Sequence, residues 1–270
     1  MTTSESFSST AAVIRRVLHA SDFSEASLVA FAHALKAALI SKSELVLIHI
    51  SDEDQRERTE FPGVRETLER WKLLPLGSPR SAVAELGIDV AKIIGRGSDP
   101  VEGVLEFIEQ HGADLIVLST HHHGLDWLHQ SVSEPVARKS GEMTLFVPAG
   151  APGFVSLADG LVSLGNILIP IAATPQPQAA IAGAVRLTQQ LKCESGKFIL
   201  LHVGENGPLP AIVTSAWRAV SRITSMTSPC FVILCHVHPG HCAGATASAS
   251  CDTLRVPYSR FPRRLIRPRS

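Results

Sequence analysis

The first 148 residues alternate short apolar runs with longer stretches in which apolar residues recur every three or four positions. The runs predict strands buried on both faces; they cover residues 13–20, 45–50, 89–95, 113–120 and 144–148. The periodic stretches predict helices; they cover residues 25–40, 51–86, 100–111 and 131–139. This alternation predicts an α/β fold, in which an open parallel sheet carries helices on both faces and all crossovers are right-handed.

Capping residues mark the start of two of these helices. Asp22 and Ser24 both precede the first helix, and Glu25 follows Asp22 at the spacing of a capping box. Asp99 precedes the helix at residue 100, which has proline in its first position and an acid in its third. Asp22 therefore has two interpretations that stay open: it caps the first helix, or it contacts a ligand.

The strand–helix pattern restarts after a Gly/Ser/Ala-rich linker at residues 149–165. Residues 166–171 predict a strand, residues 179–191 a helix and residues 197–203 a second strand. Leu201-His202-Val203 repeats Ile48-His49-Ile50 about 150 residues later, a period that indicates a duplicated domain. The pattern then stops, so residues 166–205 predict an incomplete second copy, and residues 231–234 are the one further predicted strand.

Charge and composition change abruptly at about residue 206. Residues 1–205 carry 24 of the 25 acids and 17 of the 25 Lys and Arg residues, whereas residues 206–270 carry one acid and eight arginines. Four of the five cysteines also lie in this tail, which we expect to be poorly ordered. Its cysteines and histidines suggest zinc and its arginines suggest nucleic acid, but neither follows a recognised spacing. We favour a changed reading frame, a hypothesis that translating the coding DNA in all frames tests.

Cysteine use and hydropathy bear on where the protein acts. The first 205 residues hold a single cysteine, Cys193, which suits a reducing compartment. Residues 1–12 are rich in Ser and Thr and predict a loose N-terminus, with no signal-peptide pattern. The sequence contains no run of 18 apolar residues, the length that would predict a membrane span. We therefore expect a cytoplasmic protein with no membrane partner.

Several motifs together resemble the universal stress protein family, over all of residues 13–148 and the first third of a second copy. The motifs are Val17-Leu18-His19-Ala20-Ser21-Asp22-Phe23-Ser24, Leu47-Ile48-His49-Ile50, Gly112-Ala113-Asp114-Leu115-Ile116-Val117-Leu118-Ser119-Thr120-His121 and Ser131-Val132-Ser133-Glu134-Pro135-Val136. The resemblance implies a Rossmann-like sheet of five parallel strands in the order 3-2-1-4-5. It also implies a ligand cleft between strands 1 and 4, where the direction of chain progress across the sheet reverses.

Some members of this family bind ATP through an Asp after strand 1 and a glycine-rich loop after strand 4. Asp22 matches the first feature. In the loop, however, Ser119, His122 and Gln130-Ser131 stand at the three glycine positions, and the segment is one residue short. Glycine lets backbone N–H groups approach phosphate without a Cβ in the way, so these substitutions predict weak or absent ATP binding. In the second copy Ala172 replaces the Asp, which predicts no nucleotide site there.

One set of residues is therefore the candidate ligand or nucleotide site: Ser21, Asp22, His49, Gly95, Thr120, His121 and Ser131. No nucleophile beside a base is visible, so the sequence identifies no catalytic centre. We expect no metal at His121-His122-His123, because consecutive loop residues seldom converge on one ion. The expected role is stress response through ligand sensing or protein interaction; the alternative is an ATP-binding or weakly ATP-hydrolysing switch. Family members often pair through strand 5, which predicts a homodimer through the strand from Thr144 to Pro148.

Overall fold

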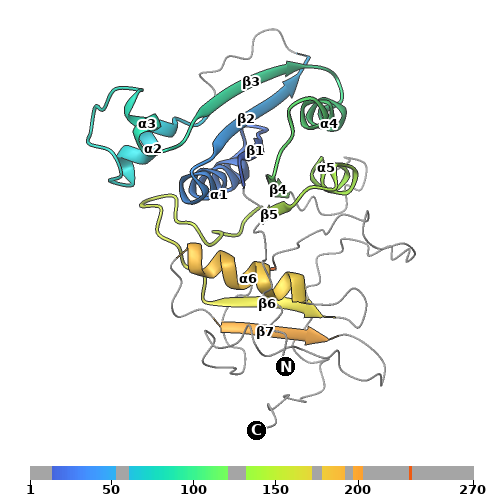
Figure 1. Cartoon of the computed structure of the whole chain (residues 1–270). Coiled ribbons are helices and arrows are strands. Elements are labelled where there is room, and N and C mark those ends of the chain that lie inside the picture. The colour runs from blue at the N-terminus through green and yellow to red at the C-terminus, as the bar shows by residue number, and fades with distance from the viewer. Residues whose placement is uncertain are drawn as a thin grey trace, which may run out of the picture. The chain divides into compact units, whose positions relative to one another are not determined.

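The computed structural model describes six parts of the chain (Figure 1): residues 14–52, 61–120, 132–171, 178–191, 197–202 and 231–232. All of them belong to one of the two units into which the chain divides, residues 1–238. None of the helices within these ranges combines the length and the apolar composition that a membrane span requires.

A five-stranded parallel sheet forms the first and larger part of this unit. Its elements are β1 (Arg16–Ala20), α1 (Glu25–Ser41), β2 (Glu44–Ser51), α2 (Val64–Arg70), α3 (Ala82–Glu85), β3 (Val90–Arg96), α4 (Pro100–His111), β4 (Leu115–Thr120), α5 (Ser133–Ser140) and β5 (Thr144–Pro148). The strand order is β3-β2-β1-β4-β5, and every pairing is parallel. The predicted α/β class and strand order are both confirmed.

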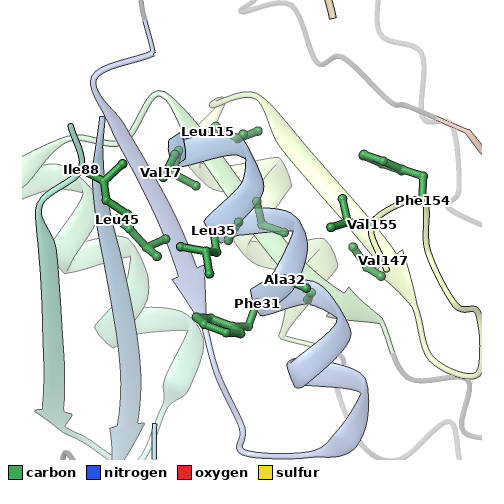
Figure 2. Close-up of a cluster of buried hydrophobic side chains, with 14 of the residues drawn as sticks. Val17, Phe31, Ala32, Leu35, Leu45, Ile88, Leu115, Val147, Phe154 and Val155 are labelled. Carbon is green, nitrogen blue, oxygen red and sulfur yellow. The ribbon is translucent and has the colours of Figure 1, made fainter. Parts of the chain in front are cut away.

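Alternate residues of the central strands face two separate cores. Val17 of β1 and Leu45 of β2 pack with residues of α1 and α2, whereas the next residues, Leu18 and Val46, pack with α4 and α5. Figure 2 shows the first core, in which Phe31 and Leu35 of α1 lie over β1 and its neighbours. Because both faces are covered, the central strands are mostly apolar, which is the pattern that predicted them.

The helix boundaries follow local chemistry. The N-cap of α1 is Ser24, whose side chain accepts a hydrogen bond from the Ser27 N–H, and the N-cap of α4 is Asp99, as predicted. The helical region expected over residues 51–86 is interrupted, as its Pro75, Gly77 and Pro79 predict. In the part that the structure describes, residues 51–52 and 61–86, its helices are α2 and the four-residue α3, and Lys72 after α2 adopts a left-handed conformation with φ 58°.

The segment at residues 149–165, predicted as a linker, folds back onto the first sheet; we call it the strap. Its Val155 and Val162 form an antiparallel bridge. Phe154, Val155 and Leu164 of the strap are buried in the same core as α1, and Figure 2 shows the first two beside Val147 of β5. The strap is therefore part of the packed structure of the first domain as well as its connection to the next strand along the chain.

A second, smaller sheet lies beyond the strap in the sequence. It contains β6 (Asn166–Ile171), β7 (Lys197–His202) and β8 (Phe231–Val232), with α6 (Gln178–Gln190) between the first two strands, and its order is β7-β6-β8. Ile167 of β6 pairs with Phe198 on one side and Phe231 on the other, just as Val17 pairs with Leu45 and Leu115. β8 thus has the place in its sheet that β4 has in the first, a position that sequence reasoning did not assign to it.

The first core generates a stability prediction. Phe31 is 2% exposed, so Phe31→Ala removes a ring packed between α1 and the sheet, and we expect a loss of about 3–5 kcal/mol in the free energy of unfolding. Leu76 is 92% exposed, so Leu76→Ala serves as the control and should change stability by less than about 0.5 kcal/mol. Urea unfolding followed by circular dichroism measures both, and similar losses in the two variants would contradict this description of the core.

Candidate functional site

The candidate site lies at the carboxyl edge of the first sheet, where β1 and β4 end side by side. β1 leads into α1 on one face of the sheet, and the helix after β4, α5, packs on the other face. Such a reversal point is the usual place for a ligand in an open α/β sheet.

Five of the seven predicted site residues are described, and all of them lie at or near this edge. Ser21 and Asp22 follow β1, His49 and Gly95 lie close to the ends of β2 and β3, and Thr120 ends β4. His121 and Ser131 lie outside the described residues. The structure therefore places the described members along one edge of the sheet, with Ser21, Asp22 and Thr120 on the two strands that flank the reversal.

A continuous chain of hydrogen bonds connects the turn after β1 to buried residues of α1, β1 and β4. The Phe23 N–H donates to Ser21 Oγ at 3.2 Å, and Ser21 Oγ lies 2.9 Å from Ser27 Oγ. Ser27 Oγ lies 3.2 Å from Nε2 of His19, whose Nδ1 lies 2.9 Å from the Val117 carbonyl. Since that carbonyl can only accept, His19 carries its proton on Nδ1, and Ser27 donates to Nε2. The chain thus links α1 to β1 and β4.

Asp22 accepts hydrogen bonds from Ser24 in the same turn. Its Oδ1 accepts hydrogen bonds from the Ser24 N–H at 3.0 Å and the Ser24 hydroxyl at 2.6 Å, while Ser24 itself caps α1. The expectation that Asp22 could be the helix cap is therefore corrected: it orients the residue that is the cap. Asp22 is exposed, so its carboxylate lies at the surface of the candidate site.

His49 completes the turn from the side of β2. Its Nδ1 donates to the Ser21 carbonyl at 2.6 Å, and its ring stacks on Phe23 at 4.3 Å between centroids. Phe23 in turn meets Phe61 edge-on at 5.1 Å. Phe23 has a φ of 61°, a conformation that non-glycine residues rarely adopt, and these ring contacts and the Ser21 bond hold it there.

Gly95 has a packing explanation that the sequence did not suggest. It lies within β3 rather than in a turn, and a Cβ at this position would come within 2.5 Å of Cδ1 of Ile50 on the neighbouring strand. The same Ile50 side chain lies 2.9 Å from where a Cβ of Gly103 would be, on α4. Gly95 therefore makes room for Ile50 beneath α4, and this contact accounts for the glycine without a ligand.

The end of β4 is anchored on both sides of the loop that leaves it. The Ser133 hydroxyl donates to the Ser119 carbonyl at 2.6 Å, which ties the first turn of α5 to the strand. The Thr120 carbonyl accepts from the Ala149 N–H at 2.7 Å, which ties the strand to the strap. These hydrogen bonds hold the end of β4 and the start of α5, the two ends of the β4–α5 connection.

Sequence reasoning missed the two buried partners beneath the site, His19 and Ser27. Burial lowers the pKa of His19 from 6.5 to about 4, against the opposing effects of its Val117 hydrogen bond and of the Asp22 charge. A hydroxyl beside a neutral imidazole resembles a nucleophile with its base, but the two residues are 1% and 0% exposed, so no substrate reaches them. The available signal was positional: polar residues on the buried faces of β1 and α1.

Within the described ranges, no cluster of three or more histidines, cysteines and acids is arranged to hold a metal ion. The predicted loop histidines at 121–123 and the cysteines of the tail lie outside those ranges. The described site offers a carboxylate, hydroxyls and backbone amides at a rigid sheet edge, groups that orient a bound molecule by hydrogen bonds.

Comparisons with known proteins show what this chain is similar to. Residues 14–148 match the model of the universal stress protein family. Universal stress protein MJ0577 of Methanocaldococcus jannaschii is 24% identical over 155 residues, which are 49% of this chain and 94% of that protein. A solved universal stress protein in complex with cAMP is 23% identical, with 51% of this chain and 99% of the other covered and a TM-score of 0.35. The corresponding values for the universal stress protein from Archaeoglobus fulgidus in complex with dAMP are 17%, 50%, 98% and 0.32.

The neutral state of His19 generates a prediction about pH. Because the pKa of His19 is lower in the folded protein than the ordinary 6.5, the unfolded chain binds the proton first. The contribution of His19 to the free energy of unfolding is therefore full above pH 6.5 and is lost as the pH falls towards 4. We expect a loss of roughly 3 kcal/mol over this range from this residue. His19→Gln should flatten the pH dependence of the free energy of unfolding, measured by urea titration between pH 7 and pH 4.

The matched control is His111→Gln, since His111 is exposed at the end of α4. This variant should keep the pH dependence of the unsubstituted protein. The description of His19 as a buried neutral residue fails if both glutamine variants show the same slope of stability against pH.

Proposed function

The chain belongs to the universal stress protein family, and we propose that it acts in stress response by binding a small ligand or a partner protein at the edge between β1 and β4. ATP binding there is weak or absent. The proposal places this action in the cytoplasm, as the single cysteine among residues 1–205 suggests.

The observation that carries the proposal is the hydrogen-bonded turn after β1. Its hydrogen bonds run from Asp22 and Ser24 down to His19 and position an exposed carboxylate at the reversal point of the sheet. Preorganisation of this kind lowers the cost of binding, because little has to be ordered when a ligand arrives. A carboxylate accepts hydrogen bonds from hydroxyl or amino groups of a ligand and repels phosphate.

The weak affinity for ATP follows from the β4–α5 loop. Ser119 has a buried side chain at the end of β4, where the nucleotide-binding members of the family have glycine. His122 and Gln130 stand at the other two glycine positions of that pattern. A Cβ at such positions hinders the approach of backbone N–H groups to phosphate oxygens.

The alternative function is an ATP-binding switch, and one observation favours it. The Ser133 hydroxyl is anchored to Ser119, so α5 begins close to the end of β4, and the first turn of a helix attracts anions. Two similar proteins have been solved in complex with cAMP and with dAMP, and these nucleotides are ligands of those two proteins. The two functions differ in a quantity that can be measured directly, the dissociation constant for ATP.

Isothermal titration calorimetry of the purified chain with Mg-ATP tests this choice. We expect no saturable binding, or a dissociation constant of about 1 mM or weaker, corresponding to roughly 4 kcal/mol. Nucleotide released from the purified protein by acid and separated by chromatography should be below one-tenth of the protein concentration, roughly what so weak a site retains. A dissociation constant near 1 μM that is abolished by Asp22→Ala would establish the ATP-binding alternative. Asp22→Asn is the matched control, because its amide oxygen still accepts from Ser24 while the charge is removed.

The proposal includes a homodimer through β5, the last strand of the first sheet in its hydrogen-bonded order. Leu145 and Phe146 of this strand are only partly buried. An apolar edge strand exposes unpaired backbone groups, which a second copy of the same strand can satisfy.

Size-exclusion chromatography with light scattering measures the assembly. The chain has a mass of 28.9 kDa, and we expect a species of about twice that mass at micromolar concentration. Leu145→Lys should shift the species to the monomer, because a charge on an edge strand opposes pairing. Leu76→Lys, at an exposed position away from the sheet, should leave the dimer intact. A monomer for the unsubstituted chain at tens of micromolar rules out pairing through β5.

A further inference from the structure

His33 of α1 joins the strap to the first domain through its imidazole ring. The residue is 2% exposed, and its Nδ1 lies 2.7 Å from the Val29 carbonyl one turn earlier in the helix. Since a carbonyl can only accept, Nδ1 carries the proton. Nε2 is therefore unprotonated and accepts two hydrogen bonds from the strap, from the Phe154 N–H at 2.9 Å and the Val155 N–H at 3.2 Å.

These bonds lie where the strap packs most closely. The Phe154 ring meets the His33 ring edge-on at 4.5 Å. Gly153 has a φ of 69°, and a Cβ there would come within 2.1 Å of Cε1 of His33. Only glycine combines this conformation with this approach, so the residue before Phe154 suits the contact with the histidine.

A second attachment holds the middle of the strap to the C-terminal end of α2. The Trp71 indole N–H and the Arg70 guanidinium both donate to the Leu157 carbonyl at 3.1 Å. Gly160, with a φ of 69°, lies against the face of Trp71, where a Cβ would come within 2.4 Å of the ring. These two attachments add to the Ala149–Thr120 hydrogen bond at the start of the strap, and of the three only the one at His33 contains a histidine.

We propose that His33 is the latch of a pH-operated strap, and that protonation of its imidazole releases the strap from α1. A proton on Nε2 would point at the N–H groups of Phe154 and Val155, leaving three donors and no acceptor. Acid therefore turns two stabilising hydrogen bonds into a repulsive contact. Because the strap runs directly into β6, its release converts a fixed connection between the two sheets into a free tether.

The surroundings of His33 favour its neutral form. Burial lowers the pKa of His33 from 6.5 to about 4, opposed only by the hydrogen bond to Val29. The packed elements carry Glu25 and Lys36 on α1, four charged residues on α2 and Asp159 on the strap, whereas β5 carries none; those of α2 are Arg65, Glu66, Glu69 and Arg70. Lys36 lies over the Trp71 ring and is attracted by Asp159. Hydrogen bonds from Ser156 and Leu161 lower the pKa of Asp159, which favours its ionised form.

The direction of the effect follows from the two protonation states. The docked strap has the lower histidine pKa, so the released strap binds the proton more tightly. Docking is therefore unaffected above pH 6.5, weakens as the pH falls towards 4 and changes no further below it. A shift of this size weakens docking by roughly two orders of magnitude over the whole range. The latch is independent of the proposed ligand site, and its test needs no ligand.

Amide hydrogen exchange of the full chain reads the latch directly, because the Phe154 and Val155 amides are the groups that His33 binds. We expect their protection factors, corrected for intrinsic exchange rates, to fall by roughly 30- to 300-fold between pH 7 and pH 4.5. The amides of β2, a central strand, should remain more strongly protected than those two amides at both pH values. Constant protection at Phe154 and Val155 overturns the proposal, and so does protection there equal to that of β2 at pH 4.5, since the second result indicates that the strap opens only by global unfolding.

Substitution separates the latch from the rest of the attachment. His33→Gln should keep the strap docked at both pH values, because Oε1 of glutamine accepts hydrogen bonds and does not titrate. His111→Gln should behave like the unsubstituted chain. Trp71→Phe removes one of the two donors of the second attachment, so it should lower protection at both pH values and leave the fold-change between them intact. A pH-dependent fall in His33→Gln equal to that of the unsubstituted chain also overturns the proposal.

Discussion

The burial of β1 between β2 and β4 is the constraint on which the first domain depends. Val17 and Leu18 of this strand are both fully buried, one towards α1 and the other towards α4 and α5. A strand enclosed on two edges and two faces can tolerate polar groups only if each has a partner. That requirement explains why His19, in the same strand, is tied to Val117 on one side and to Ser27 on the other.

The same constraint creates the candidate site. Since β1 and β4 are neighbours whose following helices pack on opposite faces, the polypeptide separates at their carboxyl ends. The turn after β1 is held by the same hydrogen bonds that give His19 its partners. The buried hydrogen-bond network and the exposed Asp22 are therefore connected. Stability of the core and order at the site are therefore coupled through Ser21 and Ser27.

Two buried histidines have the same protonation state for related reasons. His19 and His33 both lie on the α1 face of the sheet, and in each a backbone carbonyl takes the Nδ1 proton. Burial lowers both pKa values to about 4. They differ in what Nε2 does: at His19 it accepts from a hydroxyl that can reorient, whereas at His33 it accepts from backbone N–H groups that cannot. A proton is therefore more disruptive at His33.

Sequence by itself determined the order of strands and helices, the α/β class and the cap at Asp99, because burial patterns and caps act over a few residues, while it left Asp22 and Ser24 both open as the cap of α1. The resemblance to a family supplied the strand order. Only the tertiary structure decided that Gly95 makes room for Ile50, that the strap docks on α1, and that His19 and His33 bind partners 98 and 121 residues away. Contacts at such separations depend on strand register and side-chain direction, which exist only once the sheet has formed and the helices have packed on it.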